Sequence, residues 1–254
     1  LFTTNPGPVW ATALAQRYGS SASPANQGGN DYAQGGARVT QLPGVPNSPP
    51  TATAVPIATQ IQTYLGSGPI NPGALYSVWG GANDLFYQLG LVQAGAITTT
   101  QAQTNVAIAA TQLAQQVGVL SAAGARYIMV LNLPDIGKTP VYASSPASSQ
   151  ISAFAGFYNS TMNAALDALH INIIKLNIFG LFNEMLANPS AFGFANVTTP
   201  ACGATPSLLC TSANLVAPDA ASTFFYADGV HPTTAGHAVI AQAVESMLEG
   251  PAQM

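Results

Sequence analysis

A carboxylate and an imidazole stand three residues apart near the end of the chain, in the run Asp228-Gly229-Val230-His231. The chain has nine acidic residues and three histidines in 254, so few such pairings are available. An aspartate can orient a histidine, which can then take a proton from a hydroxyl group; this pairing is the base half of a nucleophilic triad. A solvated turn aspartate beside a surface histidine would give the same run. The rest of the chain decides between these two interpretations.

The composition limits the possible classes of protein. The length suits one domain or at most two, and 48% of the residues are apolar, enough for a sizeable core. Only 6% are charged, against about 25% in an average soluble protein, which fits a secreted or cell-surface protein. The net charge of −4 and five basic residues argue against nucleic-acid binding. No apolar run reaches the roughly 18 residues of a transmembrane helix.

The only two cysteines, Cys202 and Cys210, flank a loop-like segment. Metal sites usually need more ligands at tighter spacing. A local disulfide that closes a surface loop is therefore expected, and it would stabilise the fold by about 2–3 kcal/mol. Such a bond points to an oxidising compartment.

Helical patterns alternate with short apolar strands, which predicts an α/β fold with a parallel sheet and helices on both faces. In such sheets ligands lie at the carboxyl ends of the strands. The stretch 188–223 is too long for a plain connection and is predicted to be a functional or lid-like loop. The pattern predicts strands at 75–79, 127–131 and 171–176, a glycine-bearing strand and turn at 30–40, and helices at 8–18, 57–65, 99–123, 149–169, 178–186 and 233–248.

Three turns are expected at the same edge of the sheet. They are Tyr32-Ala33-Gln34-Gly35-Gly36-Ala37, Trp79-Gly80-Gly81-Ala82-Asn83-Asp84-Leu85 and the Asp228–His231 run. Their order and chemistry resemble the GDSL, or SGNH, family of esterases and lipases, and the resemblance covers essentially the whole chain.

The resemblance implies a role for each turn. Gly35 occupies the position whose backbone N–H serves the oxyanion hole, and Asn83 supplies a second donor from its side chain. Asp228 and His231 match the family's Asp-x-x-His block, in which the aspartate orients the histidine. The implied fold is a three-layer α/β/α sandwich with a mainly parallel, flavodoxin-like sheet, formed by residues 1–254 as a single domain. No metal or organic cofactor is implied.

Structural interpretations of the same residues remain open. Gly35 can be simply a turn residue, and Asn83 can be a helix N-cap. Asp84 is interpreted as a structural cap, and His237 as a residue on a helix face. His170 lies at a helix end, where the helix dipole favours histidine, and it is assigned no role.

The nucleophile is missing from this pattern, because the chain contains no Gly-Asp-Ser. In longer bacterial members of the resembled family, a segment like the one that begins at Leu1 follows the Gly-Asp-Ser-Leu block. We therefore expect the serine and the first strand to lie upstream of Leu1, as a separate or cleaved N-terminal peptide, and the chain to be inactive without them. Ser77, Ser145 and Ser148 lack the setting of a nucleophile.

These observations predict a serine-type carboxylic ester hydrolase that acts on small-molecule or lipid esters. Leu85, Phe86, Phe224 and Phe225 favour lipid or short-to-medium acyl esters. The alternatives are a carbohydrate acetylesterase with the same residues and a non-catalytic binding or display domain. The segment 248–254 resembles the junction to a β-barrel in autotransporter esterases, which would place the protein at a bacterial outer membrane or outside the cell.

Overall fold

A computed structural model of the chain describes residues 7–46 and 53–250. They form two compact units. One holds the chain up to Asp31, Lys138–Ser148 and the part from Gly180 onward, and the other holds Tyr32–Gly137 and Ser149–Phe179. The features expected at residues 1–4 and 251–254 lie outside the described residues. The single-domain assignment stays a prediction.

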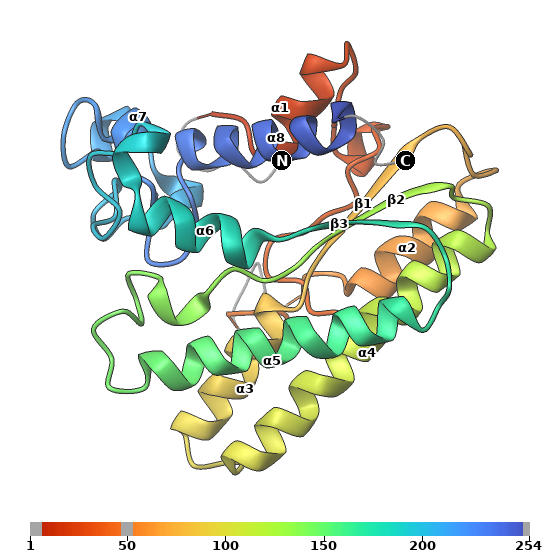
Figure 1. The fold of residues 1–254 in the computed structure, drawn as a ribbon, viewed down its shortest axis with the longest axis horizontal. Coiled ribbons are helices and arrows are strands. Elements are labelled where there is room, and N and C mark those ends of the chain that lie inside the picture. The colour runs from red at the N-terminus through yellow and green to blue at the C-terminus, as the bar shows by residue number, and fades with distance from the viewer. Residues whose placement is uncertain (1–6, 47–52, 251–254) are drawn as a thin grey trace. The chain divides into compact units, whose positions relative to one another are not determined.

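A three-stranded parallel sheet forms the centre of the second unit (Figure 1). Its strands β1 (Leu75–Trp79), β2 (Tyr127–Leu131) and β3 (Ile173–Leu176) are ordered β1-β2-β3. The central strand β2 is buried from its second residue to its last, which explains its continuous apolar run. The predicted parallel α/β arrangement is confirmed.

Four helices belong to this unit and lie on one face of the sheet in Figure 1: α2 (Ile57–Gly66), α3 (Ala82–Gln93), α4 (Thr99–Ala122) and α5 (Ser148–Asp167). Helix α4 packs against α2, α3 and β2. The side chain of Thr98 and that of Gln101 form a reciprocal capping box at its start, which satisfies two backbone donors. Apolar residues recur along α4 at intervals of four and three residues, and all of them are buried: Val106, Ala110, Leu113, Val117 and Leu120.

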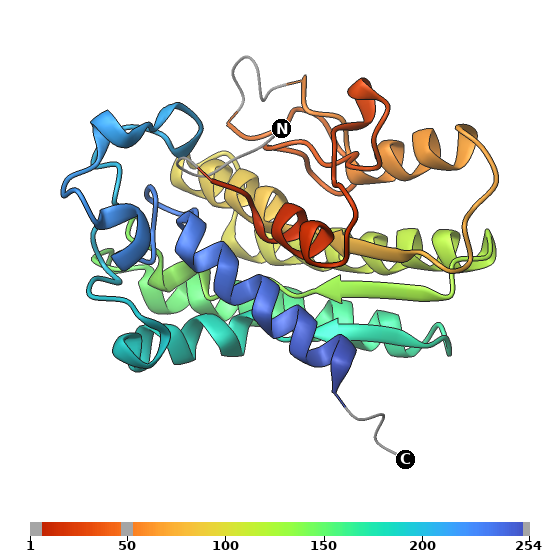
Figure 2. The ribbon, with the colours of Figure 1, turned by 90° about the horizontal axis from the view of Figure 1, so that it is seen from above.

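The first unit contains α1 (Trp10–Arg17), most of α6 (Ile178–Ala187), α7 (Ala220–Thr223) and α8 (Thr234–Glu249). Helices α1 and α8 run side by side (Figure 2). Arg17 forms an ion pair with Glu245, and the hydroxyl of Tyr18 donates to Glu249. Trp10 and Leu14 are buried on α1, and Tyr18 is exposed because it follows the last turn of the helix.

An aromatic cluster fills the core of the first unit. The ring of Phe225 contacts Phe182, Phe194 and Tyr226 edge-on. Phe225 and Leu85 are fully buried, so these two residues are core residues and give no support for an acyl-binding role. The predicted loop 188–223 contains short 3₁₀ turns and α7, and it pairs with the following chain through a bridge between Asn196 and Phe224.

Two expectations about secondary structure were incomplete or wrong. The predicted strand at 30–40 is a bridge between Asp31 and Pro24 followed by turns, because among the described residues its backbone forms no ladder with another strand. Helix α3 was not predicted as an element. Asn83, Asp84 and Gly90 have low helix propensity, and α3 is supported by packing against α4.

Candidate active site

The Asp228–His231 run forms a closed turn. Tyr226 and Pro232 form an antiparallel bridge at its base, and the amide of Ala227 donates to the carbonyl of His231 at 2.8 Å. Within the turn, Oδ1 of Asp228 accepts the backbone N–H groups of Val230 at 3.0 Å and His231 at 2.8 Å. An aspartate that binds its own downstream backbone stabilises a turn locally, so this geometry follows from the sequence.

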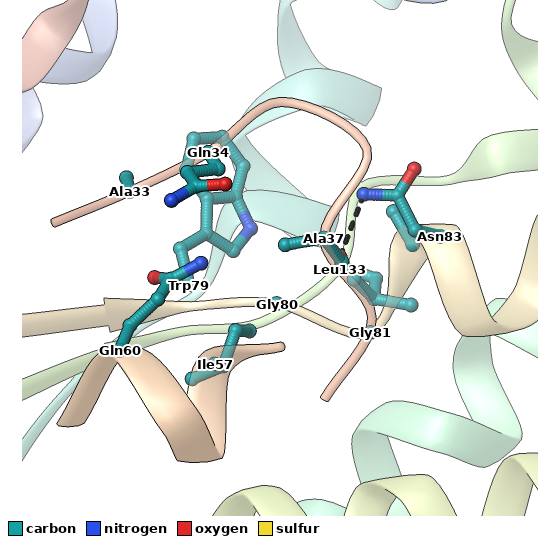
Figure 3. Close-up of a pocket in the computed structure, with 11 residues that line it drawn as sticks. Ala33, Gln34, Ala37, Ile57, Gln60, Trp79, Gly80, Gly81, Asn83 and Leu133 are labelled. Atoms are coloured by element: carbon teal, nitrogen blue, oxygen red, sulfur yellow. Dashed lines mark hydrogen bonds between the residues drawn. The ribbon is translucent and has the colours of Figure 1, made fainter. Parts of the chain in front are cut away.

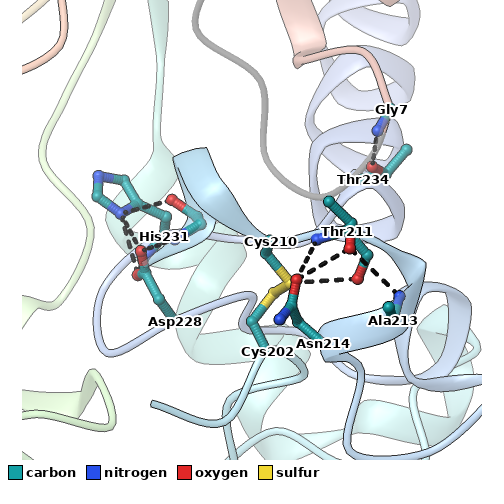
Figure 4. Close-up of a disulfide and its surroundings, with 10 residues drawn as sticks. Gly7, Cys202, Cys210, Thr211, Ala213, Asn214, Asp228, His231 and Thr234 are labelled. Carbon is teal, nitrogen blue, oxygen red and sulfur yellow. Dashed lines mark hydrogen bonds and ion pairs between the residues drawn. A yellow bond between two sulfur atoms is a disulfide. The ribbon is translucent and has the colours of Figure 1, made fainter. Parts of the chain in front are cut away.

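The imidazole of His231 faces the carboxylate of Asp228. Its Nδ1 lies 2.9 Å from Oδ2 and 3.0 Å from Oδ1. Burial alone would raise the pKa of Asp228, but the hydrogen bond and charge of His231, with the backbone N–H groups of Val230 and His231, outweigh it and hold this pKa well below 3.8. Because a carboxylate only accepts hydrogen bonds, Nδ1 must be the donor. In neutral His231 the basic lone pair is therefore on Nε2, which points away from Asp228 (Figure 4).

Ser207 joins this pair, and its place between the two cysteines was the one feature of the sequence that pointed to it. Its backbone N–H donates to Oδ2 of Asp228 at 2.9 Å, and its hydroxyl lies 3.4 Å from Nδ1 of His231. The hydroxyl thus meets the ring nitrogen that already binds Asp228, and Ser207 is only 2% exposed. Ser207 therefore has the wrong geometry for a nucleophile, which must meet Nε2 and be open to a substrate.

The predicted disulfide between Cys202 and Cys210 is present (Figure 4). Both sulfur-bearing residues are buried and pack against Ala227, the residue that precedes Asp228. The bond is compatible with an extracellular location. No helix in the described part of the chain has the length and apolar character needed to cross a membrane.

Gly35 lies in a β-turn of the second unit. The amide of Ala37 donates to the carbonyl of Gln34 at 3.2 Å, which places Gly35 and Gly36 at the turn's central positions. Gly36 has φ = +85°, and a positive φ at this position favours glycine. Gly35 therefore lies in a turn, as the sequence predicts, and its oxyanion role stays a prediction.

Asn83 fastens this turn to the start of α3. Its Nδ2 donates to the carbonyl of Ala37 at 2.9 Å (Figure 3). The N-cap of α3 is Gly81 rather than Asn83, so the capping interpretation of Asn83 is wrong. An amide nitrogen carries two hydrogens, and the bond to Ala37 uses one of them while fixing the orientation of the group.

Asp84 also differs from its expected role as a cap. It is 3% exposed, and its Oδ2 accepts the backbone N–H of Val39 at 2.9 Å while Oδ1 meets Nε of Arg38 at 3.4 Å. Burial raises the pKa of Asp84, although the Val39 amide and Arg38 oppose this effect. Arg38 also stacks over the ring of Tyr87 at 4.1 Å. Asp84 thus holds the chain that follows the Gly35 turn against α3.

A cavity of about 170 Å³ lies between this turn and the end of β1 (Figure 3). Ala37, Trp79 and Asn83 are among its lining residues. Gly80 and Gly81 also line the cavity. A Cβ at Gly81 would lie 2.1 Å from the ring of Tyr158, and Gly81 has φ = +106°, so both packing and backbone favour glycine there. A Cβ at Gly80 would lie 2.1 Å from the end of the Ile57 side chain, which would have to move.

His237 lies on α8, as predicted, and is buried. Neither ring nitrogen has a hydrogen-bond partner within the described part of the chain. Burial, together with the charge of His231, lowers the pKa of His237 to about 3 from its ordinary 6.5. Unfolding therefore takes up a proton at His237 at any pH between these two values.

We expect His237 to make the protein acid-sensitive. As the pH falls from 6.5 towards 3, the unfolded state binds the extra proton, and the free energy of unfolding falls by about 1.4 kcal/mol per pH unit. In wild-type protein the free energy of unfolding, measured in urea, should fall between pH 7.5 and pH 4.5. In His237→Leu this fall should be smaller by about 2–3 kcal/mol. His170→Asn, at an exposed position with φ = +52° that asparagine tolerates, should leave the loss unchanged. An equal loss in His237→Leu would contradict the assignment.

The described residues contain no group of three or more His, Cys, Asp or Glu side chains that could hold a metal ion. The first unit holds the carboxylate–imidazole pair of Asp228 and His231, and the second unit holds the Gly35 turn and the Asn83 amide.

Comparison with known proteins gives a consistent picture. Residues 3–244 match the family described as GDSL-like Lipase/Acylhydrolase. A Pseudomonas putida protein described as "Uncharacterized protein in trpE-trpG intergenic region" is 33% identical over 252 residues, covering 92% of this chain and 40% of that protein. "Esterase EstA" of Pseudomonas aeruginosa is 32% identical over 189 residues, covering 71% of this chain and 27% of the esterase. "Lipase 1" of Photorhabdus luminescens is 24% identical over 305 residues, covering 94% of this chain and 45% of the lipase. The chain thus spans less than half the length of these three relatives.

Proposed function

Because the chain belongs to the GDSL-like lipase and acylhydrolase family, whose members hydrolyse esters, we propose that it is the catalytic part of a serine-type carboxylic ester hydrolase. The observation that carries this proposal is the Asp228–His231 pair, with an ionised carboxylate on Nδ1 and with Nε2 pointing away from it. This arrangement suits a histidine that takes a proton from a hydroxyl group.

The proposed mechanism has two halves. Nε2 of His231 takes the proton of a serine hydroxyl as the serine oxygen attacks the ester carbonyl, and the protonated His231 then gives this proton to the departing alcohol. A water molecule repeats the attack on the acyl-serine, again losing its proton to Nε2, and releases the acid as the serine is reprotonated. Asp228 keeps Nδ1 protonated and stabilises the imidazolium in both halves.

Gly35 and Asn83 are proposed as donors to the oxyanion that forms in each half. Negative charge develops on the carbonyl oxygen, and fixed N–H donors stabilise it without reorganisation. The hydrogen bond from Asn83 to the carbonyl of Ala37 supports this role, because it holds the amide still and ties it to the turn of Gly35.

The serine is proposed to lie upstream of Leu1, on a strand that pairs with β1. One observation supports this placement. The strand β1 forms one edge of the sheet in the described part of the chain, so a further strand could pair with its outer side.

Serine labelling combined with an ester series tests the proposal. The full-length protein should react with a fluorophosphonate at a serine upstream of Leu1, and it should hydrolyse p-nitrophenyl esters in preference to acetylated sugars. A preference for acetylated sugars would favour the acetylesterase alternative. If the protein shows neither labelling nor hydrolysis, a binding or display domain at the cell surface would be favoured. Labelling at Ser207 would overturn the assigned nucleophile.

A further inference from the structure

The loop closed by Cys202 and Cys210 is built onto the chain that leads into the Asp228 turn. The amides of Ala201 and Cys202 donate to the carbonyls of Tyr226 and Ala227 at 2.8 and 2.9 Å. The disulfide packs on Ala227. Both ends of the loop are therefore held directly beside the residue that precedes Asp228.

Ser207 lies inside this closed loop, at the first position of a short 3₁₀ turn. The backbone N–H of Ser207 donates to Oδ2 of Asp228. The backbone N–H groups of Val230 and His231 both donate to Oδ1 instead. Oδ2 is also the oxygen nearest to Nδ1 of His231. The loop therefore binds Oδ2 of Asp228, whereas the backbone of the Asp228–His231 turn binds Oδ1.

We propose that the disulfide-closed loop 202–210 is a positioning element for the Asp228–His231 pair, and that the backbone N–H of Ser207 fixes the plane of the Asp228 carboxylate. This inference rests on the proposed function for its effect on catalysis. The disulfide acts through Ser207, because it limits the conformations of the loop that presents the amide. Loss of this amide leaves Oδ2 with one fewer donor and lets the carboxylate rotate.

A second consequence can be measured without any substrate. Hydrogen bonds to a carboxylate favour its ionised form, so loss of the Ser207 amide should raise the pKa of Asp228 towards its ordinary value. The charge of His231 lowers the pKa of Asp228, and it also lowers the pKa of His237 on α8. Both histidines remain in the variants described below. A change in the pKa of Asp228 in these variants therefore comes from the loss of the hydrogen bond that the loop supplies.

Ser207→Pro removes the amide hydrogen at a position that accepts proline. The first position of a helical turn tolerates proline, and Pro206 has ψ = 142°, which suits a residue before proline. In the full-length protein we expect kcat to fall about tenfold, the equivalent of one hydrogen bond to a charged group, with KM unchanged. Carboxyl ¹³C NMR should show a raised pKa for Asp228.

Ser212→Pro is the matched control, since Ser212 is exposed and also begins a 3₁₀ turn, and it should change neither kcat nor the titration. Reversible reduction of the disulfide provides a second test that involves no substitution. The reduced, folded protein should show both changes and lose them on reoxidation, and Cys202→Ala/Cys210→Ala should not respond to the reductant.

The outcomes separate this inference from the proposed function. A raised pKa of Asp228 in a protein without esterase activity would support the positioning of the carboxylate and reject the ester hydrolase. Wild-type kcat and an unchanged Asp228 titration, in Ser207→Pro or in the reduced folded protein, would overturn the inference.

Discussion

Replacing His231 by alanine is expected to lower kcat for ester hydrolysis in the full-length protein by about 10⁴- to 10⁶-fold, with little change in KM. The substitution removes the group that is proposed to take the proton of the serine and return it to the leaving alcohol. Oxyanion stabilisation and substrate binding do not need the imidazole, so some catalysis over water should remain.

The structure defines how this loss should be measured. The side chain of His231 is 43% exposed, so its removal leaves no large cavity, and the variant should remain folded. His170→Asn provides a histidine substitution at an exposed site on the other unit and should keep wild-type activity. Activity of His231→Ala within tenfold of wild type would refute the role of this residue.

Replacing Asp228 by asparagine is expected to lower kcat by about 10⁴-fold. The carboxylate accepts the Nδ1 proton at 2.9 Å, whereas an amide can present its NH₂ group and stabilise the tautomer in which Nε2 carries the proton. That tautomer cannot act as a base at Nε2. The amide also lacks the charge that stabilises the imidazolium.

A matched substitution separates this effect from a general loss of charge. Asp219 is exposed and its side chain does not cap α7, so Asp219→Asn changes the net charge equally and should leave kcat unchanged. Single-turnover measurements of acylation with a p-nitrophenyl ester would locate the loss at the first proton transfer. A fall of less than tenfold in Asp228→Asn would show that another group orients His231.

The parts of the fold that could be predicted from the sequence are those with a strong local pattern. The apolar runs of β1 and β2 and the spacing in α4 gave their positions to within one residue. In contrast, a strand exists only through pairing with another strand, and within the described residues the stretch 30–40 forms a single isolated bridge, between Asp31 and Pro24. Its sequence alone could not show this.

The candidate site divides in the same way. Asp228 and His231 are three residues apart, and a turn brings them together with bonds to their own backbone. Ser207 reaches the same carboxylate from 21 residues away, and its signal in the sequence is no more than its place between two cysteines. His237 and His231 lie in the same short stretch of chain, but His237 is buried whereas the side chain of His231 is partly exposed, and the sequence does not show this difference.

The sequence by itself determined the parallel α/β class, the local disulfide and the Asp228–His231 pair, because each depends on residues that are close along the chain or on a periodic apolar pattern. Only the tertiary structure decided that Asn83 binds Ala37, that Asp84 holds Val39 and that the Ser207 amide binds Asp228. Each of these bonds joins residues at least 21 positions apart. Such contacts form only when packing closes the intervening loops, and no local residue preference specifies them.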